Sequence, residues 1–482
     1  MHKKISVNIF FNVLLTLSQV AFPVITFPYL SRVLKPDGQG TVNFIDNITQ
    51  YLIFISAIGV PVYGMREISK HKDDHAAIKR IFSELVLINL VNAILISTAY
   101  FLAIYFFLHT IPYYKLYFFG CFILVINVFT VDWLYQGMEE FPFITTRNIF
   151  IKIISICLTF LFVKSKADLN IYYILLLTTY FLNAVLNITF AYRKFGITFK
   201  PSLTRKKTLK SHIKPILYIF SANLAISIFL YFDSVILGLF KGYTAVGFYA
   251  TATKIVKLPA IAIQAVIMVF VPRISFEYKQ NNLQEVNSLI QRSFDFITLI
   301  SVPITIGLFC YADVAIHIFA GNYYDQCILL LRVMCPIIFF LSLTNIFIWE
   351  ILTPMGKEKY FLVTVSIAMI VSFGLNLLLV PKISYTGSSI ATLATEFTVA
   401  LCAWIFARKV FAFKFNFSNL LRSLAASLPF IPVCYLVKHY SPGNIPIQLL
   451  SIAACIILYF SIHTFVYRST IIKELVLFVR SK

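Results

Sequence analysis

Charged residues are scarce in this sequence. They make up 13% of the 482 residues, whereas 59% of the residues are hydrophobic and the mean hydropathy is +0.84. Ordinary soluble domains carry about 25% charged residues, so this composition excludes a large soluble protein and indicates an integral membrane protein. The ~10-residue alternation of membrane barrel strands is also missing, so we expect helical spans of about 20 apolar residues each.

The sequence also lacks the motifs of several enzyme classes. It contains no Gly-x-x-x-x-Gly-Lys-Ser/Thr phosphate loop, no His-Glu-x-x-His motif and no Cys-x-x-Cys pair. Its eight cysteines show neither metal-ligand spacing nor a disulfide framework. No segment outside the apolar stretches is long enough to form a catalytic domain. We therefore expect no enzymatic activity, no catalytic residues, no metal and no cofactor.

Fourteen apolar segments predict about fourteen transmembrane helices, the first of which resembles a signal peptide but lacks a cleavage site and is expected to be retained. An even number places both termini on one side of the membrane. With the termini in the cytoplasm, 30 of the 41 Lys and Arg residues fall on the cytoplasmic side and nine on the other. This bias agrees with the positive-inside rule and explains the net charge of +21 without nucleic acid as a partner. The segments are roughly 8–33, 41–65, 81–108, 113–136, 148–163, 170–192, 215–240, 244–272, 293–311, 328–353, 360–380, 385–407, 418–437 and 445–467.

A basic linker divides the chain into two predicted lobes. Weak similarity between the turns at 33–40 and 239–247 suggests a repeat of six helices, with two lobes related by an axis along the membrane normal. The linker's charge fits plain topology, and it could also attract anionic lipid. The predicted division is an N-terminal lobe at 1–192, a cytoplasmic linker at 193–214, a C-terminal lobe at 215–409, and two further spans with a cytoplasmic tail at 410–482.

The stretch from Asn127 to Asn148 contains the most informative polar residues. Asp132 lies at the end of an apolar segment, and the next segment opens with Arg147. An ionisable group inside an apolar span is expensive, so it is a candidate for function. The alternative is an acid at a helix end near the membrane interface, without a functional role.

A few other charges lie inside predicted spans. Lys254 and Lys257 are three residues apart and should share one helix face, where they could hold a phosphate. They could instead form buried ion pairs with acids on other spans. The candidates for substrate binding are Lys254, Lys257, Arg32, Arg66 and Arg147, and those for cation coupling or ion pairing in a lumen are Asp132, Asp233 and Glu396.

Several short motifs, in order along the chain, resemble the Wzx-type polysaccharide transporter or O-antigen flippase family. The most specific is Asp132-Trp133-x-x-Gln136-Gly137-x-Glu139. Ser388-Ser389-Ile390 departs from the pattern, which we expect to affect packing only. The other motifs are Phe27-Pro-Tyr-Leu-Ser-Arg32, Gly38-x-Gly40, Tyr63-Gly-Met-Arg66-Glu67, Asp233-Ser-Val-Ile-Leu-Gly238, Val246-Gly-Phe-Tyr249, Asn376-x-x-Leu-x-Val-Pro381, Gly387 and Glu396.

This resemblance implies the fold of the multidrug/oligosaccharidyl-lipid/polysaccharide exporter superfamily. It implies a flippase that moves undecaprenyl-diphosphate-linked oligosaccharides to the periplasmic leaflet of a bacterial inner membrane, for O-antigen or another surface polysaccharide. Its partners would be this substrate, membrane lipids, a polysaccharide polymerase and a chain-length regulator. Two alternatives remain open: a cation-coupled multidrug exporter of the same superfold, and a membrane-embedded polysaccharide polymerase or ligase.

Overall fold

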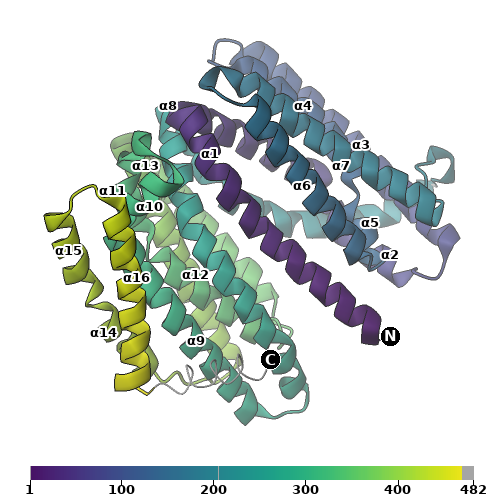
Figure 1. Cartoon of the computed structure of the whole chain (residues 1–482). Coiled ribbons are helices and arrows are strands. Elements are labelled where there is room, and N and C mark those ends of the chain that lie inside the picture. The colour runs from purple at the N-terminus through teal and green to yellow at the C-terminus, as the bar shows by residue number, and fades with distance from the viewer. Residues whose placement is uncertain (1, 205, 469–482) are drawn as a thin grey trace. The chain divides into compact units, whose positions relative to one another are not determined.

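The computed structural model describes residues 2–204 and 206–468 (Figure 1). In these residues the chain is built of helices joined by short turns, and it contains no strand. The α-helices up to the middle of the chain are α1 (His2–Ala57), α2 (Val60–Lys70), α3 (His75–Ala103), α4 (Tyr114–Asn127), α5 (Asp132–Gly137), α6 (Phe141–Phe162), α7 (Leu169–Phe195) and α8 (Lys206–Lys279).

The second half continues in the same way. Its α-helices are α9 (Leu283–Cys310), α10 (Ala312–Phe319), α11 (Gln326–Met334), α12 (Ile337–Asn345), α13 (Lys359–Val410), α14 (Ser418–Ser427), α15 (Phe430–Tyr440) and α16 (Ile445–Ser461). Short 3₁₀ or π segments are η1 (Ile104–Leu108), η2 (Val128–Thr130), η3 (Lys166–Asp168), η4 (Pro201–Leu203), η5 (Asn322–Tyr324), η6 (Ile346–Leu352) and η7 (Ile462–Val466).

Ten helices of the described chain are long and apolar enough to cross a membrane, or eleven if the pair Ala21–Ala57 and Val60–Lys70, bent by 44°, forms one span. The prediction of an all-helical membrane protein is therefore confirmed. The number fourteen stays a prediction, as do the side of the membrane on which each loop lies and the position of both termini. Arg205 of the basic linker and residues 469–482 of the tail lie outside the described residues.

Three long helices are interrupted where the sequence predicts turns. α1 contains Lys35 (φ 57°), α8 contains Gly242 (φ 79°), and α13 contains Ser384 (φ 52°), each outside the helical region of backbone space. A left-handed conformation ends regular helix hydrogen bonding, so each of these helices consists of two segments. The breaks in α1 and α8 fall within the predicted turns at 33–40 and 239–247.

These two turns pack against each other without side chains between them. A Cβ atom on Gly40 would lie 1.7 Å from the carbonyl oxygen of Tyr243, and one on Gly247 would lie 2.0 Å from that of Pro36. Only glycine allows backbones to approach so closely. The Thr244 hydroxyl also donates to the Asp37 carboxylate at 3.4 Å. Gly40 and Gly247 are thus explained by this contact.

The chain separates into two compact units, Met1–Gly247 and Phe248–Lys482. The lobe boundaries predicted at the basic linker stay a prediction. The core of the first unit gathers residues of α2, α3, α5 and α6, among them Phe82, Trp133 and Tyr135. In the second unit the Phe294 and Phe415 rings stack at 4.2 Å, and the last helices α15 and α16 pack against each other. Figure 1 shows α15 and α16 side by side in yellow.

Candidate functional site

The candidate site begins at a break in the helix that carries Asp132. α4 ends at Asn127, a single 3₁₀ turn follows, and Val131 adopts φ 27° and ψ 34° before α5 starts at Asp132. A positive φ is unusual for a β-branched residue, and the surrounding contacts must hold it. The Thr130 hydroxyl donates to the Asn127 carbonyl at 2.8 Å, and the Val131 side chain is buried. The break ends α4 and presents Asp132 at the start of a new helix.

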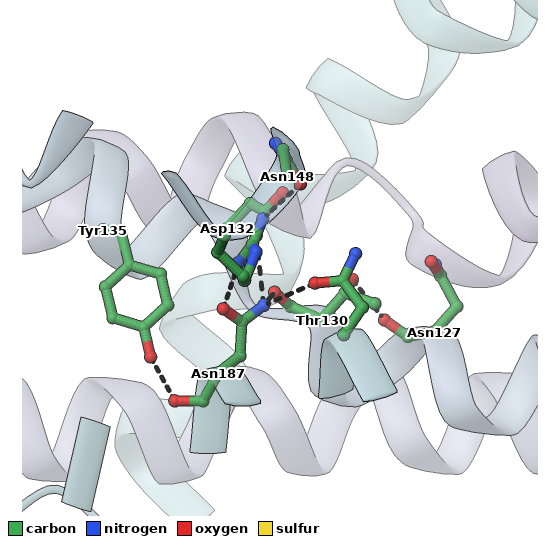
Figure 2. Close-up of polar contacts among 8 residues, drawn as sticks. Asn127, Thr130, Asp132, Tyr135, Asn148 and Asn187 are labelled. Carbon is green, nitrogen blue, oxygen red and sulfur yellow. Dashed lines mark hydrogen bonds and ion pairs between the residues drawn. The ribbon is translucent and has the colours of Figure 1, made fainter. Parts of the chain in front are cut away.

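Arg147, on α6, is the partner of Asp132. Its Nη1 lies 2.8 Å from Asp132 Oδ1, and its Nη2 donates to Asn148 Oδ1 at 2.9 Å (Figure 2). The Arg147 side chain is 1% exposed and that of Asp132 is 38% exposed. The guanidinium is therefore held inside the protein, whereas the carboxylate is accessible on one side.

Asn187, on α7, completes the network. Its side-chain amide donates to Asp132 Oδ1 at 3.1 Å and to the carbonyl oxygen of Thr130, and its Oδ1 accepts from Arg147 Nη1. The Tyr135 hydroxyl donates to the Asn187 backbone carbonyl (Figure 2). One fully buried amide thus links the break, α5, α6 and α7.

The electrostatics of this network favour a fixed ion pair. A buried cation is costly unless a partner charge and hydrogen bonds satisfy it, and Asp132, Asn148 and Asn187 supply both. Of the three guanidinium nitrogens of Arg147, Nε is buried without a hydrogen-bond partner among the described residues, whereas Nη1 and Nη2 both donate. Removal of Asp132 would leave the guanidinium uncompensated in the interior.

The structure brings together two of the predicted site residues, Asp132 and Arg147, and places the others elsewhere. Arg32 is exposed and donates to the Pro28 carbonyl at 3.0 Å, and Arg66 is exposed on α2. Asp233 is 9% and Glu396 3% exposed, both engaged in interactions.

Lys254 is exposed and Lys257 partly exposed, both on the second part of α8. Asp233 belongs to the first unit, whereas Lys254, Lys257 and Glu396 belong to the second. A shared lumen for these residues therefore stays a prediction.

The largest described apolar cavity of the second unit is lined by none of these candidate residues. The second unit holds a cavity of about 430 Å³ bordered by α9, α10, α15 and α16, with an almost entirely apolar lining that includes Leu299, Pro303, Ile452 and Tyr459. Such a lining offers no charge to a phosphate. Among the described residues, no group of three or more His, Cys, Asp or Glu side chains could hold a metal ion.

Sequence reasoning missed Asn187. Its signal was weak: two amides four residues apart, Asn183 and Asn187, in an otherwise apolar span. This spacing puts both on one helix face, and a lipid-facing amide would be unfavourable. The same reasoning would have found Glu84, which lies inside a predicted span and is fully buried in the structure.

Comparison with known proteins identifies the family. The family described as polysaccharide biosynthesis protein matches residues 5–276, more than half of the chain. The chain belongs to this family. The matched region contains the whole Asp132–Arg147–Asn187 network, so the network lies in the part of the chain that defines membership.

Relatives of this chain have names that refer to transport. The chain is 26% identical over 413 residues to a protein of Escherichia coli (strain K12) named as an O-antigen transporter, covering 83% of this chain and 96% of that one. It is 22% identical over 250 residues to a Haloferax volcanii protein named as a low-salt glycan biosynthesis flippase, covering 52% of each. The predicted family resemblance is therefore confirmed.

Solved structures with the same fold are membrane transporters. The lipid II flippase MurJ in an inward closed conformation matches with a TM-score of 0.73 and 16% identity, covering 96% of this chain and 98% of that chain. An inward-facing multidrug transporter of the MATE family in the MOP superfamily matches with a TM-score of 0.67 and 14% identity, covering 82% and 97%. At these identities the likeness shows the fold alone. It confirms the fold class predicted from the sequence.

Proposed function

We propose that this protein is a flippase for lipid-linked oligosaccharides, moving undecaprenyl-diphosphate-linked units from the cytoplasmic to the periplasmic leaflet. The observation that carries the proposal is the nearly full-length match to the O-antigen transporter relative, which covers 96% of that protein. The similarity to MurJ supports the proposal, because MurJ, which has the same fold, is named as a flippase for lipid II. The proposed setting is the inner membrane of a bacterium, with surface polysaccharide as the product.

The physics of the substrate suits a helical membrane protein with few charges. The carrier tail can remain in the bilayer, whereas the sugars and the diphosphate must cross the hydrocarbon in a polar, locally cationic cavity that opens to each side in turn. We propose Lys254 and Lys257 as the diphosphate-binding cations, with Arg32 and Arg66 at span ends as further contacts. Lysine and arginine both serve as phosphate binders.

Coupling to a cation gradient is part of the proposal, with Asp233 and Glu396 as its acids. Asp132 is a weaker candidate for this role, because its carboxylate already forms an ion pair with Arg147, whose Nη1 lies 2.8 Å from Asp132 Oδ1. A cation that bound Asp132 would compete with a buried guanidinium. We assign the pair to fixing the break before α5, so Arg147 acts as a positioning residue.

A deletion strain tests the function. Loss of the gene should remove the surface polysaccharide and cause the complete carrier-linked unit to accumulate on the cytoplasmic leaflet. Accumulation of single units on the periplasmic side would instead indicate a polymerase. Drug sensitivity with intact surface glycan would indicate a multidrug exporter. Either result would overturn the flippase proposal.

Substitution of the lysines tests the proposed diphosphate site. Lys254→Ala and Lys257→Ala together should leave the amount of folded protein unchanged and lower export, and arginine at both positions should restore it because phosphate needs the charge. Normal export by the double alanine variant would remove both residues from the mechanism.

A further inference from the structure

Two cysteines lie side by side where the last helices of the second unit meet α9. Cys310 is the final residue of α9, and Cys434 lies in the middle of α15. The Cys434 thiol donates to the Cys310 carbonyl oxygen at 3.1 Å, and the two thiols are hydrogen-bonded to each other. Both cysteines are free in the structure. Since 124 residues separate them along the chain, the sequence pattern does not indicate a pair.

An ion pair holds the two helix ends together at this point. Lys438, one turn after Cys434 on α15, donates to the Cys310 carbonyl oxygen at 2.7 Å and to Asp313 Oδ1 at 2.5 Å. On the buried side, Cys434 packs against Tyr311 of the same corner. A disulfide needs two cysteines whose backbones are already close, and these contacts keep the two backbones close.

The pair lies at a partly exposed end of the helices. The side chains of Lys438 and Asp313 are 25% and 26% exposed, and Cys310 is partly exposed whereas Cys434 is buried. Charged groups at the ends of membrane helices extend toward the aqueous interface. In the topology predicted from the sequence, the segments 293–311 and 418–437 both end on the outer side of the membrane. Disulfides form and persist in the oxidising compartments outside the cytoplasm.

A third cysteine lies near this pair but has a different partner. Cys455, on α16, is buried and hydrogen-bonded to the Tyr311 hydroxyl. It interacts with Cys310 and Cys434 electrostatically, whereas those two thiols share a hydrogen bond. Within the described chain, no group of three or more His, Cys, Asp or Glu side chains could hold a metal ion, so the three thiols do not form a metal site.

We propose that Cys310 and Cys434 form a disulfide on the outer side of the membrane, which ties α15 to the end of α9. One of the two cysteines, as its thiolate, attacks a sulfur of an oxidant disulfide in the outer compartment, forms a mixed disulfide and releases one thiolate. The other cysteine, also as its thiolate, attacks the protein sulfur of the mixed disulfide and releases the second thiolate. The two protons lost by the cysteines go to the released thiolates. The cysteines are thus oxidised by two electrons, and the oxidant disulfide is reduced to two thiol groups.

The proposed disulfide lies beside the apolar cavity of the second unit. Tyr311, next to Cys310, and Phe430, one turn before Cys434, both line this cavity of about 430 Å³. α9 and α15 therefore each form part of its wall. A covalent bond between them limits how far the two helices can separate, and so how wide the cavity can open at that end. The inference goes beyond the proposed flippase function and does not depend on which substrate is moved.

Thiol labelling in cells tests the bond. Cells that make the full-length protein are acidified to trap their thiols, and the protein is then dissolved in SDS and labelled with a maleimide. Without reductant, the wild type should take up two labels fewer than its eight cysteines, and reduction should restore all eight. A peptide map should show the Cys310–Cys434 link. Cys310→Ser and Cys434→Ser should each take up the same number of labels with and without reductant, whereas Cys455→Ser should still lose two.

Two results of this experiment would overturn the proposal. One is complete labelling of both Cys310 and Cys434 without reductant, and the other is a link from Cys434 to Cys455 in place of the proposed one. The peptide map of the wild type decides between these outcomes even if a serine variant fails to fold.

Thermal unfolding of the purified protein tests the constraint on α15. A cross-link that closes a long loop restricts the unfolded chain and stabilises the folded one. Reduction should therefore lower the melting temperature of the wild type by several degrees and leave that of Cys310→Ser unchanged. Cys157→Ser removes an exposed cysteine of the first unit, so it is the matched control and should respond as the wild type does. An equal response of the wild type and Cys310→Ser to reduction would show that no bond ties α15 to α9.

Discussion

Asp132 and Glu350 are two acids placed where a regular helix is interrupted, and their surroundings differ. Asp132 follows a 3₁₀ turn in the first unit and pairs with Arg147 and Asn187. Glu350 lies in the π-helix η6 of the second unit, is completely buried, and accepts one hydrogen bond, from Ser293 Oγ at 2.6 Å. Its Oε2 is buried without a partner among the described residues.

The difference shows two ways to place an acid among apolar helices. In the first unit a buried cation neutralises a carboxylate, and an amide fixes the geometry. In the second unit a single hydroxyl contacts the acid, which is too little to stabilise a full negative charge in the interior. We therefore expect Asp132 to act as an anion and Glu350 as a neutral, protonated carboxyl group. Matched substitutions in the two units test this difference.

The largest effect is expected for Asp132→Asn. This change leaves the guanidinium of Arg147 buried without its counter-charge, at a cost of about 3 kcal/mol, the low end for a broken buried pair because Asp132 is partly exposed. The melting temperature of the purified protein should fall clearly. Combining it with Arg147→Met should recover part of the loss, and a double variant no better than the single one would show that the pair is not the cause.

A smaller loss is expected for Ser293→Ala. It removes the hydrogen bond that Glu350 accepts, and an unsatisfied buried polar group costs about 1–2 kcal/mol. Ser301→Ala is a suitable control, because Ser301 lies on the same helix and its hydroxyl makes no hydrogen bond among the described residues. Thermal unfolding of both variants measures the difference, and equal melting temperatures would contradict the proposed contact.

Asp74→Ala tests an acid outside the membrane spans. The backbone N–H groups of Ala77 and then Ala76, together with the charges of His71 and Arg80, hold the pKa of the Asp74 carboxyl below its ordinary value. A depressed pKa contributes stability above the unfolded value of about 3.9, and this contribution is lost only as the pH falls through the folded value. The substitution should therefore lower the melting temperature slightly at both about pH 6 and about pH 8. An unchanged melting temperature at both pH values would contradict this assignment.

The smallest effect, and the one that decides the comparison, is expected for Glu350→Gln. Glutamine has the shape and the neutral charge of a protonated glutamic acid, so the stability should change by less than about 1 kcal/mol. The same chemical change at Asp132 should cost severalfold more. A loss at Glu350 as large as that at Asp132 would mean that Glu350 is ionised, and the contrast between the two acids would disappear.

The sequence was sufficient for the fold and for part of the site. Apolar segments of spanning length indicated the helices, and the glycine-containing turns coincided with the breaks in α1 and α8. Asp132 stood out because a charge in an apolar stretch is visible in any single sequence. Asn187 did not, because its role depends on packing with Arg147, 40 residues away. The π-helix around Glu350 could not be predicted either, since it has no pattern of its own in apolar sequence.

The contact between the turns at Gly40 and Gly247 has a consequence for the order in which the protein is made. Asp37 and Thr244, which it brings together, are 207 residues apart. During synthesis the first unit therefore cannot close until the ribosome has passed residue 247, well beyond the basic linker. Until then the turn at 33–40 lacks the turn at 239–247 as its packing partner, so its surface stays exposed. A chain cut at residue 192 or 214 should remain permanently in that unfinished state and be exposed to proteolysis.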